Sequence, residues 1–466
     1  MKRDIWDKLI EWKNKKDRKP LILKGARQVG KTYIVRAFGK ECFSQAHYLN
    51  FEKHEQLAKI FEGDLTPQNI LRDLSFYLNT SINKENDLVI FDEIQNAPRA
   101  LTSLKYFQEE LPELAICAAG SLLGVHLSDG SFPVGKVEFL NMFPMSFEEF
   151  LRGAGDIKSF EFLRSLQDRR DRERSGAIPE IVHAHLWEQL KIYFVTGGLP
   201  EIVTTFVEYK DDLFTALQKV REKQDNLIST YIADIAKHSG KQNAMHIERL
   251  WRNVPAQLAK EHDGSAPKFK FKGIIPGISR YSGLAGSIDW LGAAGLIVKA
   301  RIVNSGQLPF SAHAAENSFK LYVFDVGLLG ALSGLPPKSV LEYEYGSYKG
   351  YFAENFVAQE FVCSGVKELY CWREGSSEVE FLREINGDVL PVEIKSGWVT
   401  QAKSIKVFAQ KYHPKYRTIF SANNLSLDPV NKVHRYPLYL ASCPPAGEAG
   451  FAQGTLPACP GLINGS

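Results

Sequence analysis

The stretch that decides the fold is LILKGARQVGKTYIVRAFGK, residues 21–40. The apolar residues Leu21 to Leu23 predict a buried strand, and the periodic apolar residues after Thr32 predict a helix. Between them, residues 25–32 match the spacing G-x-x-x-x-G-K-T in full. In a strand–loop–helix unit, this spacing lets main-chain N–H groups surround phosphate oxygens at the positive end of the helix. The stretch therefore predicts a phosphate-binding loop at the start of an α/β domain.

This loop contains the side chains needed to bind a nucleoside triphosphate together with Mg²⁺. Lys31 is expected to place its positive charge against the β and γ phosphates, and the Thr32 hydroxyl to ligate the metal ion. The alternative, a glycine-rich turn with a chance Lys-Thr pair, does not account for the flanking strand and helix. The expected nucleotide-binding residues are those of the whole loop: Gly25, Ala26, Arg27, Gln28, Val29, Gly30, Lys31 and Thr32.

A second, acidic motif fits the same chemistry. The stretch DLVIFDE, residues 87–93, predicts a buried strand that ends in two carboxylates. Asp92 is expected to complete the Mg²⁺ shell, and Glu93 to orient or deprotonate the attacking water. Acidic residues often end buried strands, so this assignment depends on the phosphate loop.

A third apolar stretch, LAICAAGS, ends at Ser121, whose hydroxyl either contacts the γ-phosphate or caps a loop. Strands that are apolar throughout and alternate with helical segments are typical of a parallel sheet with helices on both faces. In such sheets the ligand lies at the carboxyl ends of the strands. The three motifs are therefore expected to meet at one edge.

Length and composition describe an ordinary globular chain. Its 466 residues suggest about three domains. The hydrophobic fraction of 44% and the charged fraction of 24% are typical of soluble domains, and the formal charge of +3 does not by itself indicate a nucleic-acid partner. The six cysteines include no C-x-x-C pair, which argues against a zinc site and against a disulfide framework.

The first twenty residues predict an amphipathic helix packed on the first domain. Ile5, Trp6, Leu9 and Ile10 recur at helical spacing. Acidic residues in the same segment argue against a signal or transit peptide. No apolar run approaches the ~18 residues that a membrane span requires. We therefore expect a cytoplasmic protein with no membrane partner.

Five stretches carry a resemblance to a known group: GARQVGKT, LVIFDEIQ, AAGSLLG, PVGKVEFLNMFPMSFEEFL and YFVTGGLPEIV. They resemble the bacterial and archaeal AAA-class P-loop ATPases whose ATPase core precedes a C-terminal domain of unknown function. The likeness continues in ENSFKLYVFDVGLL and reaches to about residue 440. It implies ATP and Mg²⁺ as cofactors and ATP hydrolysis as the activity. An arginine finger does not follow from spacing, although Arg27 and Lys136 are basic residues to consider.

The middle segment reads as helical. HIERLWRNVPAQLAKEH predicts one amphipathic helix with Ile247, Leu250, Trp251, Val254 and Leu258 on one face. Helices followed by a hairpin suggest a winged helix, which in other proteins binds DNA or serves as a dimerisation or lid element. KFKFK, residues 268–272, alternates as a half-buried strand with a basic face, which either contacts phosphates or protects a sheet edge.

The stretch EVEFLREINGDVLPVEIKSG, residues 378–397, predicts a hairpin, with Asn386 and Gly387 as a type I′ turn. This register pairs Ile385 with Asp388, Phe381 with Val392, and Val379 with Ile394, which form one apolar face. On the other face Glu380 lies opposite Glu393, and Lys395 is level with Glu378. Opposed carboxylates destabilise a sheet, so either solvent screens them or a cation, such as a divalent metal ion, lies between them.

The elements around the hairpin resemble the PD-(D/E)xK nuclease core. Their expected order is a helix at 350–362, a strand at 368–374, the hairpin, a helix at 401–412 and a strand at 417–422. The resemblance assigns metal binding to Glu354, Glu380 and Glu393, and catalysis to Glu380, Glu393 and Lys395. Residue 380 is Glu where this core usually has Asp, one methylene shorter. A fold that only holds DNA or a protein partner therefore stays open beside a nuclease.

The expected fold class is α/β, with a P-loop NTPase domain (1–200), a helical or winged-helix segment (201–340), a restriction-endonuclease-like α/β domain (341–440) and a disordered tail (441–466). The first functional hypothesis is a Mg²⁺-dependent ATPase coupled to a nuclease-like domain that acts on DNA. The second is an ATP-driven switch whose C-terminal domain only binds a partner. A homo-oligomer is compatible with both.

Overall fold

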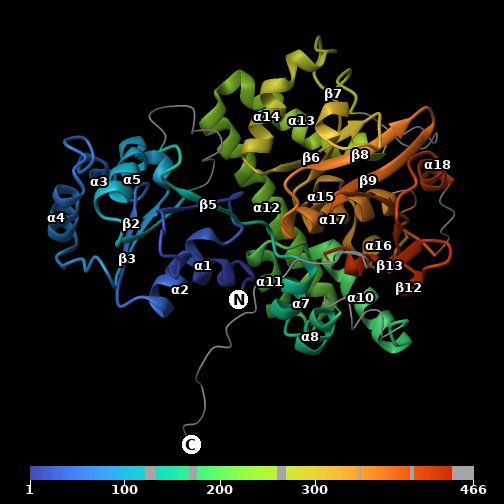
Figure 1. Cartoon of the computed structure of the whole chain (residues 1–466), viewed down its shortest axis with the longest axis horizontal. Coiled ribbons are helices and arrows are strands. Elements are labelled where there is room, and N and C mark those ends of the chain that lie inside the picture. Colours follow the sequence, from blue (N-terminus) through green and yellow to red (C-terminus); the bar gives the residue numbers. More distant parts are fainter. Residues whose placement is uncertain are drawn as a thin grey trace, which may run out of the picture.

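The computed structural model describes residues 1–466 except 121–132, 167–175, 260–268, 345, 347, 399–402 and 443–466. Within these residues the strands form two sheets, one of five strands near the N-terminus and one of eight strands in the C-terminal half. Helices from the middle of the chain lie between them (Figure 1). Ser121, Lys268 and all but the first two residues of the expected tail lie outside the described residues.

The first sheet is parallel, as the sequence predicts, and its strand order is β2-β3-β4-β1-β5. Alternate residues of its strands enter two separate cores, since Leu21 and Ile90 pack on one face while Ile22 and Phe91 pack on the other. The strands are β1 (Leu21–Lys24), β2 (Ala46–Asn50), β3 (Leu88–Asp92), β4 (Ala115–Ala119) and β5 (Glu138–Asn141).

Helices cover both faces of this sheet. The opening helix is confirmed, because Leu9 and Trp12 are buried and the Trp6 ring lies 5.6 Å from the Phe38 ring of α2. The helices on this face are α1 (Ile5–Lys13) and α2 (Lys31–Cys42). The other face packs against α3 (Gln56–Lys59), α4 (Pro67–Leu78), η1 (Ile94–Asn96) and α5 (Pro98–Glu110).

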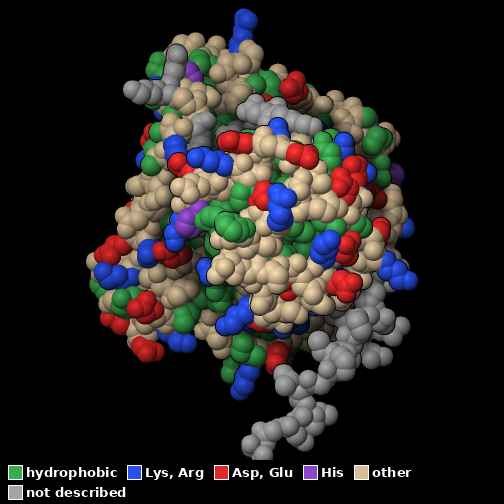
Figure 2. All heavy atoms as spheres, turned by 90° about the vertical axis from the view of Figure 1, so that its left-hand side faces the viewer, with side chains coloured by type: hydrophobic (Ala, Val, Ile, Leu, Met, Phe, Trp, Pro, Cys, Tyr) green, Lys and Arg blue, Asp and Glu red, His purple; other side chains and the backbone are tan. Residues whose placement is uncertain are grey.

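The surface at this end of the molecule carries interspersed acidic and basic side chains, with no large patch of one sign (Figure 2). This mixture agrees with the nearly balanced formal charge of +3.

The middle of the chain is helical, as expected. The first helices of this part, among the described residues, are α7 (Phe147–Ala154), α8 (Ile157–Ser165), α10 (Glu180–Thr196), α11 (Pro200–Tyr209) and α12 (Leu213–Ser239). They are followed by α13 (Lys241–Ala259), η2 (Tyr281–Gly283) and α14 (Ala285–Ala293). The apolar face predicted for α13 is confirmed, because Ile247, Leu250, Trp251, Val254 and Leu258 are all buried.

The strand predicted at KFKFK is wrong for the described residues 269–272. Phe269 is buried and Lys270 and Lys272 are exposed, so the alternation is present. However, the side-chain amide of Gln257 in α13 bonds to both backbone groups of Lys270, at 3.1 Å and 3.0 Å. A helix side chain therefore takes the place of a neighbouring strand.

The second sheet is mixed, with the order β12-β13-β11-β10-β9-β8-β6-β7. Its strands are β6 (Ile297–Val303), β7 (Ala314–Val323), β8 (Leu369–Glu374), β9 (Ser377–Ile385), β10 (Asp388–Ile394), β11 (Arg417–Ser421), β12 (Ser426–Asp428) and β13 (Val433–Pro437). The accompanying helices are η3 (Phe310–His313), α15 (Val326–Leu332), α16 (Pro337–Leu341), α17 (Tyr348–Cys363), α18 (Lys403–Tyr412) and η4 (Leu438–Leu440).

The order expected around the hairpin is present as α17, β8, β9, β10, α18 and β11. The hairpin register is confirmed at Ile385–Asp388 and at Phe381–Val392. Both turn residues have positive φ, 52° at Asn386 and 82° at Gly387. The sheet also includes β6 and β7, which precede residue 340, because β6 pairs with β8. The hairpin of the expected winged helix is thus part of the C-terminal sheet, and the boundary at 340 stays a prediction.

No single helix among the described residues has the length and apolarity needed to cross a membrane. The pair α10 and α11 meets that test of length and composition together, with a bend of 119° between its two helices. Leu186, Leu190 and Tyr193 of α10 are buried inside the molecule.

Candidate functional site

The predicted phosphate loop connects the end of β1 to the start of α2. Gly25 and Gly30 have φ angles of 149° and 98°, and Gly30 immediately precedes the first residue of α2. A Cβ atom on Gly25 would lie 2.1 Å from the carbonyl oxygen of Met142. The loop therefore requires glycine at its first position, and its conformation directs main-chain N–H groups toward a phosphate at the helix N-terminus.

Lys31 is held by the loop itself. Its Nζ donates hydrogen bonds to the carbonyl oxygens of Gly25 and Ala26, at 2.8 Å and 2.7 Å. Burial lowers the pKa of Lys31 to about 8, although the nearby carboxylates of Glu93 and Asp92 oppose this shift. These two hydrogen bonds hold the ammonium group beside the place where a triphosphate would bind. An anionic ligand there would stabilise the charged form of Lys31.

Thr32 and Asp92 meet at the carboxyl end of β3, as the sequence predicts. The Thr32 hydroxyl donates to the Asp92 carboxylate at 3.1 Å, and the Tyr48 hydroxyl donates to the same group at 2.6 Å. The pKa of Asp92 is raised, chiefly by burial. Mg²⁺ is usually bound by one or two protein oxygen atoms together with phosphates and water. This hydroxyl and carboxylate therefore fit a Mg²⁺ ion that arrives with the nucleotide.

Glu93 follows Asp92 and turns toward the same cavity. Its φ of 53° places it in the left-handed region, so its side chain leaves the direction of β3. The Gln95 amide donates to Glu93 Oε2 at 2.5 Å. A carboxylate fixed in this way beside the phosphate loop is suited to orient or deprotonate a water molecule.

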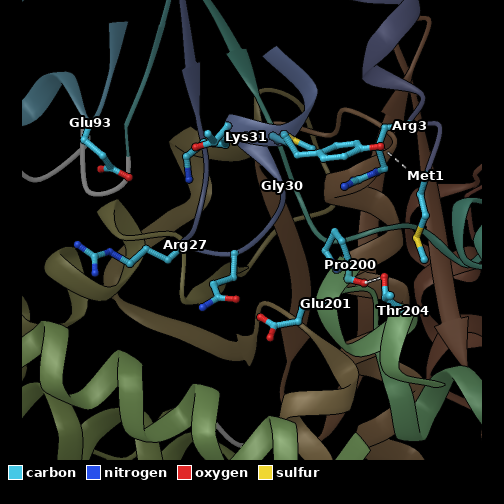
Figure 3. A pocket seen from close by; sticks show the side chains of 13 residues that line it. Met1, Arg3, Arg27, Gly30, Lys31, Glu93, Pro200, Glu201 and Thr204 are labelled. Atoms are coloured by element: carbon cyan, nitrogen blue, oxygen red, sulfur yellow. Dashed lines mark hydrogen bonds between the residues drawn. The ribbon is translucent and has the colours of Figure 1, made fainter. Parts of the chain in front are cut away.

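Lys31 and Glu93 line one cavity of about 560 Å³, and Asp92 lies just outside its lining, bonded to Thr32. Glu93 lies at one end, Lys31 lies near the middle, and Met1 and Thr204 lie at the other end (Figure 3). Pro200, Glu201 and Thr204 come from α11 and form a wall that the sequence analysis did not assign. The segment YFVTGGLPEIV was the available signal, but it was noted only for its resemblance. The remaining lining residues are Arg3, Arg27, Gln28, Gly30, Thr32, Tyr33 and Met142.

Arg27 connects the phosphate loop to α12. Its guanidinium forms an ion pair with Asp234 at 2.8 Å, and its carbonyl oxygen accepts a hydrogen bond from the Tyr231 hydroxyl at 2.8 Å. Lys136, the other basic residue considered for the hydrolysis step, pairs with Glu109 at 3.0 Å. The source of an arginine finger stays open.

The four residues assigned to the C-terminal site do come together. Glu354 comes from α17, Glu380 from β9, and Glu393 and Lys395 from the end of β10. Lys395 Nζ lies 2.6 Å from Glu393 Oε1 and 3.9 Å from Glu380 Oε1. Burial raises the pKa of Glu380, and the neighbouring carboxylate of Glu393 raises it further.

The sequence analysis missed Lys320 of β7, which enters this cluster from the other side. Its Nζ lies 3.2 Å from Glu354 Oε2 and also forms an ion pair with Glu378. The Tyr322 hydroxyl donates to Glu354 Oε2 at 3.1 Å. In the stretch ENSFKLYV, three acidic or polar residues and one phenylalanine precede Lys320, and nothing local in that stretch points to a buried lysine.

The arrangement of this cluster does not fit a ready metal site. Lysine ammonium groups lie between the carboxylates, where a divalent ion would otherwise balance their charge. Among the described residues, no group of three or more His, Cys, Asp or Glu side chains is arranged to hold a metal ion. Two buried carboxylate oxygens, Glu378 Oε2 and Glu393 Oε2, nevertheless accept no hydrogen bond.

Comparison with known families divides the chain into three parts. Residues 17–151 match the AAA domain family. Residues 187–339 and residues 349–439 match two domains of unknown function, DUF8612 and DUF4143. No curated protein matches the chain.

Several solved structures share distant similarity. The Walker-type ATPase PABY2304 of Pyrococcus abyssi is 17% identical, with 71% of this chain and 95% of that chain covered and a TM-score of 0.45. A RuvB variant of Thermotoga maritima is 13% identical, with coverages of 68% and 91% and a TM-score of 0.32. The Drosophila ORC bound to DNA is 15% identical, with coverages of 70% and 94% and a TM-score of 0.28. These scores are too low to carry an argument about function.

The family match coincides with the parallel sheet, the phosphate loop and the two carboxylates at the end of β3. Residues 17–151 are therefore an AAA-type P-loop ATPase domain, and the chain is an ATP hydrolase.

Proposed function

We propose that this ATPase is an ATP-driven switch whose C-terminal domain binds a partner without cleaving DNA. The position of Lys320 carries this proposal. Its ammonium group lies between Glu354 and Glu378, while Lys395 pairs with Glu393. Two lysines therefore supply positive charge to the opposed carboxylates, and removing either lysine would leave a buried carboxylate without its partner.

The switch also requires that the two halves of the molecule be mechanically connected. The buried core is continuous from α1 to the C-terminal sheet. The Phe147 ring of α7 lies 5.7 Å from the Tyr193 ring and 6.4 Å from the Phe356 ring of α17. These packed rings connect α7 to α17, which supports a change in domain packing on ATP binding or hydrolysis.

A second candidate function is the Mg²⁺-dependent nuclease first expected from the sequence, acting on DNA. It is favoured by the two buried carboxylate oxygens, Glu378 Oε2 and Glu393 Oε2, that accept no hydrogen bond. A cation admitted by a movement of Lys320 would be bound by such atoms. The two candidates differ in whether the protein cuts phosphodiesters.

Two substitutions separate nucleotide binding from hydrolysis. We expect Lys31→Ala to abolish MgATP binding in calorimetry, because the loop loses the charge that faces the phosphates. We expect Glu93→Gln to bind MgATP with wild-type affinity but to lower kcat by about 10²–10⁴-fold, because the water is no longer activated. Glu85→Gln, an exposed carboxylate on the same domain, is the control. Wild-type turnover by Glu93→Gln would refute the assignment of the general base.

The pH dependence of binding tests the state of Lys31. The pKa of Lys31 is about 8 without ligand, and a triphosphate raises it. MgATP binding therefore takes up a proton above about pH 8, and affinity falls by up to about tenfold per pH unit as the pH rises further. Calorimetry at pH 8.5 in buffers of different ionisation enthalpy measures this uptake. An affinity for MgATP that stays constant between pH 7 and 9.5, with no proton uptake, would contradict the lowered pKa of Lys31.

A cleavage assay decides between the two candidates. Under the proposed function, the purified protein leaves single- and double-stranded DNA intact with Mg²⁺ or Mn²⁺, with or without ATP. Metal-dependent cleavage by the wild type that disappears in Glu393→Ala and persists in Glu384→Gln would establish the nuclease instead. Glu384 is the matched control because it is exposed on the same hairpin.

Removing the buried lysine tests its structural contribution. We expect Lys320→Met to lower the free energy of unfolding by about 3–5 kcal/mol, because Glu354 and Glu378 stay buried without their cation. Lys338→Met, which removes an exposed pair with Glu342, should cost less than about 0.5 kcal/mol. Urea denaturation measures both. Equal stability of the two variants would show that the cluster does not depend on Lys320.

A further inference from the structure

Two sequence motifs that lie far apart in the chain form one unit beside the nucleotide cavity. The first is the GGLP loop, residues 197–200, which connects α10 to α11. The second is FDVGLL, residues 324–329, which begins α15 in the C-terminal half. Asp325 joins them, because its Oδ2 accepts a hydrogen bond from the Gly198 N–H at 2.7 Å. Its Oδ1 accepts one from the Leu328 N–H at 3.0 Å.

The glycines of both motifs allow this contact. A Cβ atom on Gly197 would lie 2.1 Å from Asp325 Oδ1, and one on Gly198 would lie 2.0 Å from the carbonyl oxygen of Met145. A Cβ atom on Gly327 would lie 2.5 Å from the carbonyl oxygen of Thr196. The two backbones therefore approach too closely for any side chain at these three positions.

Asp325 is fully buried and charge-assisted hydrogen bonds hold it. Burial raises its pKa to about 6, while the N–H groups of Gly198, Leu328 and Gly327 lower the pKa. At neutral pH the group is a carboxylate that accepts bonds from both motifs. An asparagine in its place would turn an NH₂ group toward one of these N–H donors.

Other contacts hold the GGLP loop and the end of α10 that immediately precedes it. The Gln224 amide of α12 donates to the carbonyl oxygens of Val195 and Thr196, at 2.7 Å and 3.3 Å. Gly198 O accepts a hydrogen bond from the Met145 N–H at 2.6 Å. Asp325 is distinct among these contacts because it comes from the C-terminal half and carries a charge.

The GGLP loop sets the position of α11, whose first residues form one wall of the cavity. α11 begins at Pro200, and Pro200, Glu201 and Thr204 line the cavity. In Figure 3, Thr204 lies at the end of the cavity opposite Glu93, and Pro200 and Glu201 lie between Thr204 and the middle of the cavity. If Glu93 marks the γ-phosphate end, as the proposed function requires, the nucleoside would lie toward the α11 wall.

We propose that Asp325 is a positioning residue for nucleotide binding, which fixes α11 against the nucleoside part of ATP from the C-terminal half of the chain. The proposal rests on ATP binding in this cavity. It makes affinity for the nucleoside depend on a residue about 300 positions beyond the phosphate loop. We expect the residues assigned to phosphate and Mg²⁺ to keep their places, because they belong to the phosphate loop, α2 and β3, whereas Asp325 bonds to Gly198 and Leu328.

The test compares Asp325→Asn with a matched control, Asn355→Leu. Asn355 is equally buried and bonds to both backbone groups of Val323 at 2.8 Å, but these bonds do not reach the GGLP loop. Calorimetry of the full chain with MgATP, MgADP and magnesium tripolyphosphate measures affinity, and steady-state assays measure KM and kcat. Thermal unfolding of both variants measures the loss of stability that they share.

We expect Asp325→Asn to weaken MgATP and MgADP binding by about tenfold, or ~1.4 kcal/mol, and to raise KM equally. Tripolyphosphate affinity should stay within about twofold and kcat within about threefold, because Lys31, Thr32 and Glu93 keep their places. Asn355→Leu should lower the unfolding temperature without changing affinity. A second variant, Gln224→Met, loosens the same loop from α12 and should weaken MgATP binding by about threefold.

Wild-type affinity in Asp325→Asn would overturn the proposal, as would an equal loss for tripolyphosphate or an equal loss in Asn355→Leu. If Asp325→Asn does not fold, an unchanged MgATP affinity in Gln224→Met overturns it, and the threefold loss supports it. A wild-type protein that binds no MgATP would instead refute the function on which the proposal rests.

Discussion

The structure depends on the close packing of α10 and α17 against the segment that leads from β5 into α7. At its centre, the Tyr193 hydroxyl donates to the carbonyl oxygen of Met145 and accepts a hydrogen bond from the Gln359 amide at 2.8 Å. Glu360 of α17 accepts a hydrogen bond from the Phe147 N–H, the first donor of α7, at 3.0 Å. The Glu360 side chain, from the C-terminal half, thus provides the acceptor for the first N–H group of α7. Burial holds the pKa of Glu360 well above its usual range. Since a buried helix end requires a partner, the start of α7 depends on α17.

Features set by neighbouring residues were predictable from the sequence. The phosphate loop, the acidic end of β3, the opening helix and the hairpin register all follow from spacings of a few residues, and the structure places them as expected. The failed strand at KFKFK shows the limit of such patterns. The sequence alternates there, but the side-chain amide of Gln257 in α13 bonds to both backbone groups of Lys270. Local periodicity cannot show which element supplies a hydrogen-bond partner.

The residues missed by the sequence analysis all act over long separations. Lys320 reaches Glu354 and Glu378 only because β6 and β7 join the C-terminal sheet, a pairing that no local pattern indicates. Likewise, Pro200 and Thr204 reach the nucleotide cavity because Asp325 fixes the loop before α11. The sequence did indicate that the opposed carboxylates of the hairpin need either solvent or a cation to offset their charge. In the folded chain, ammonium groups fill that position.

The contact between Gly198 and Asp325 also bears on how such a chain can evolve. A catalytic module that contains its whole pocket can be moved between proteins by recombination. In this protein the downstream half holds one wall of the pocket in place, so a transplanted N-terminal half would keep α11 but lose the Asp325 contact that fixes it. The two halves are therefore expected to be inherited as a pair. Replacement of a glycine in the GGLP loop or in FDVGLL would require a compensating substitution in the other motif.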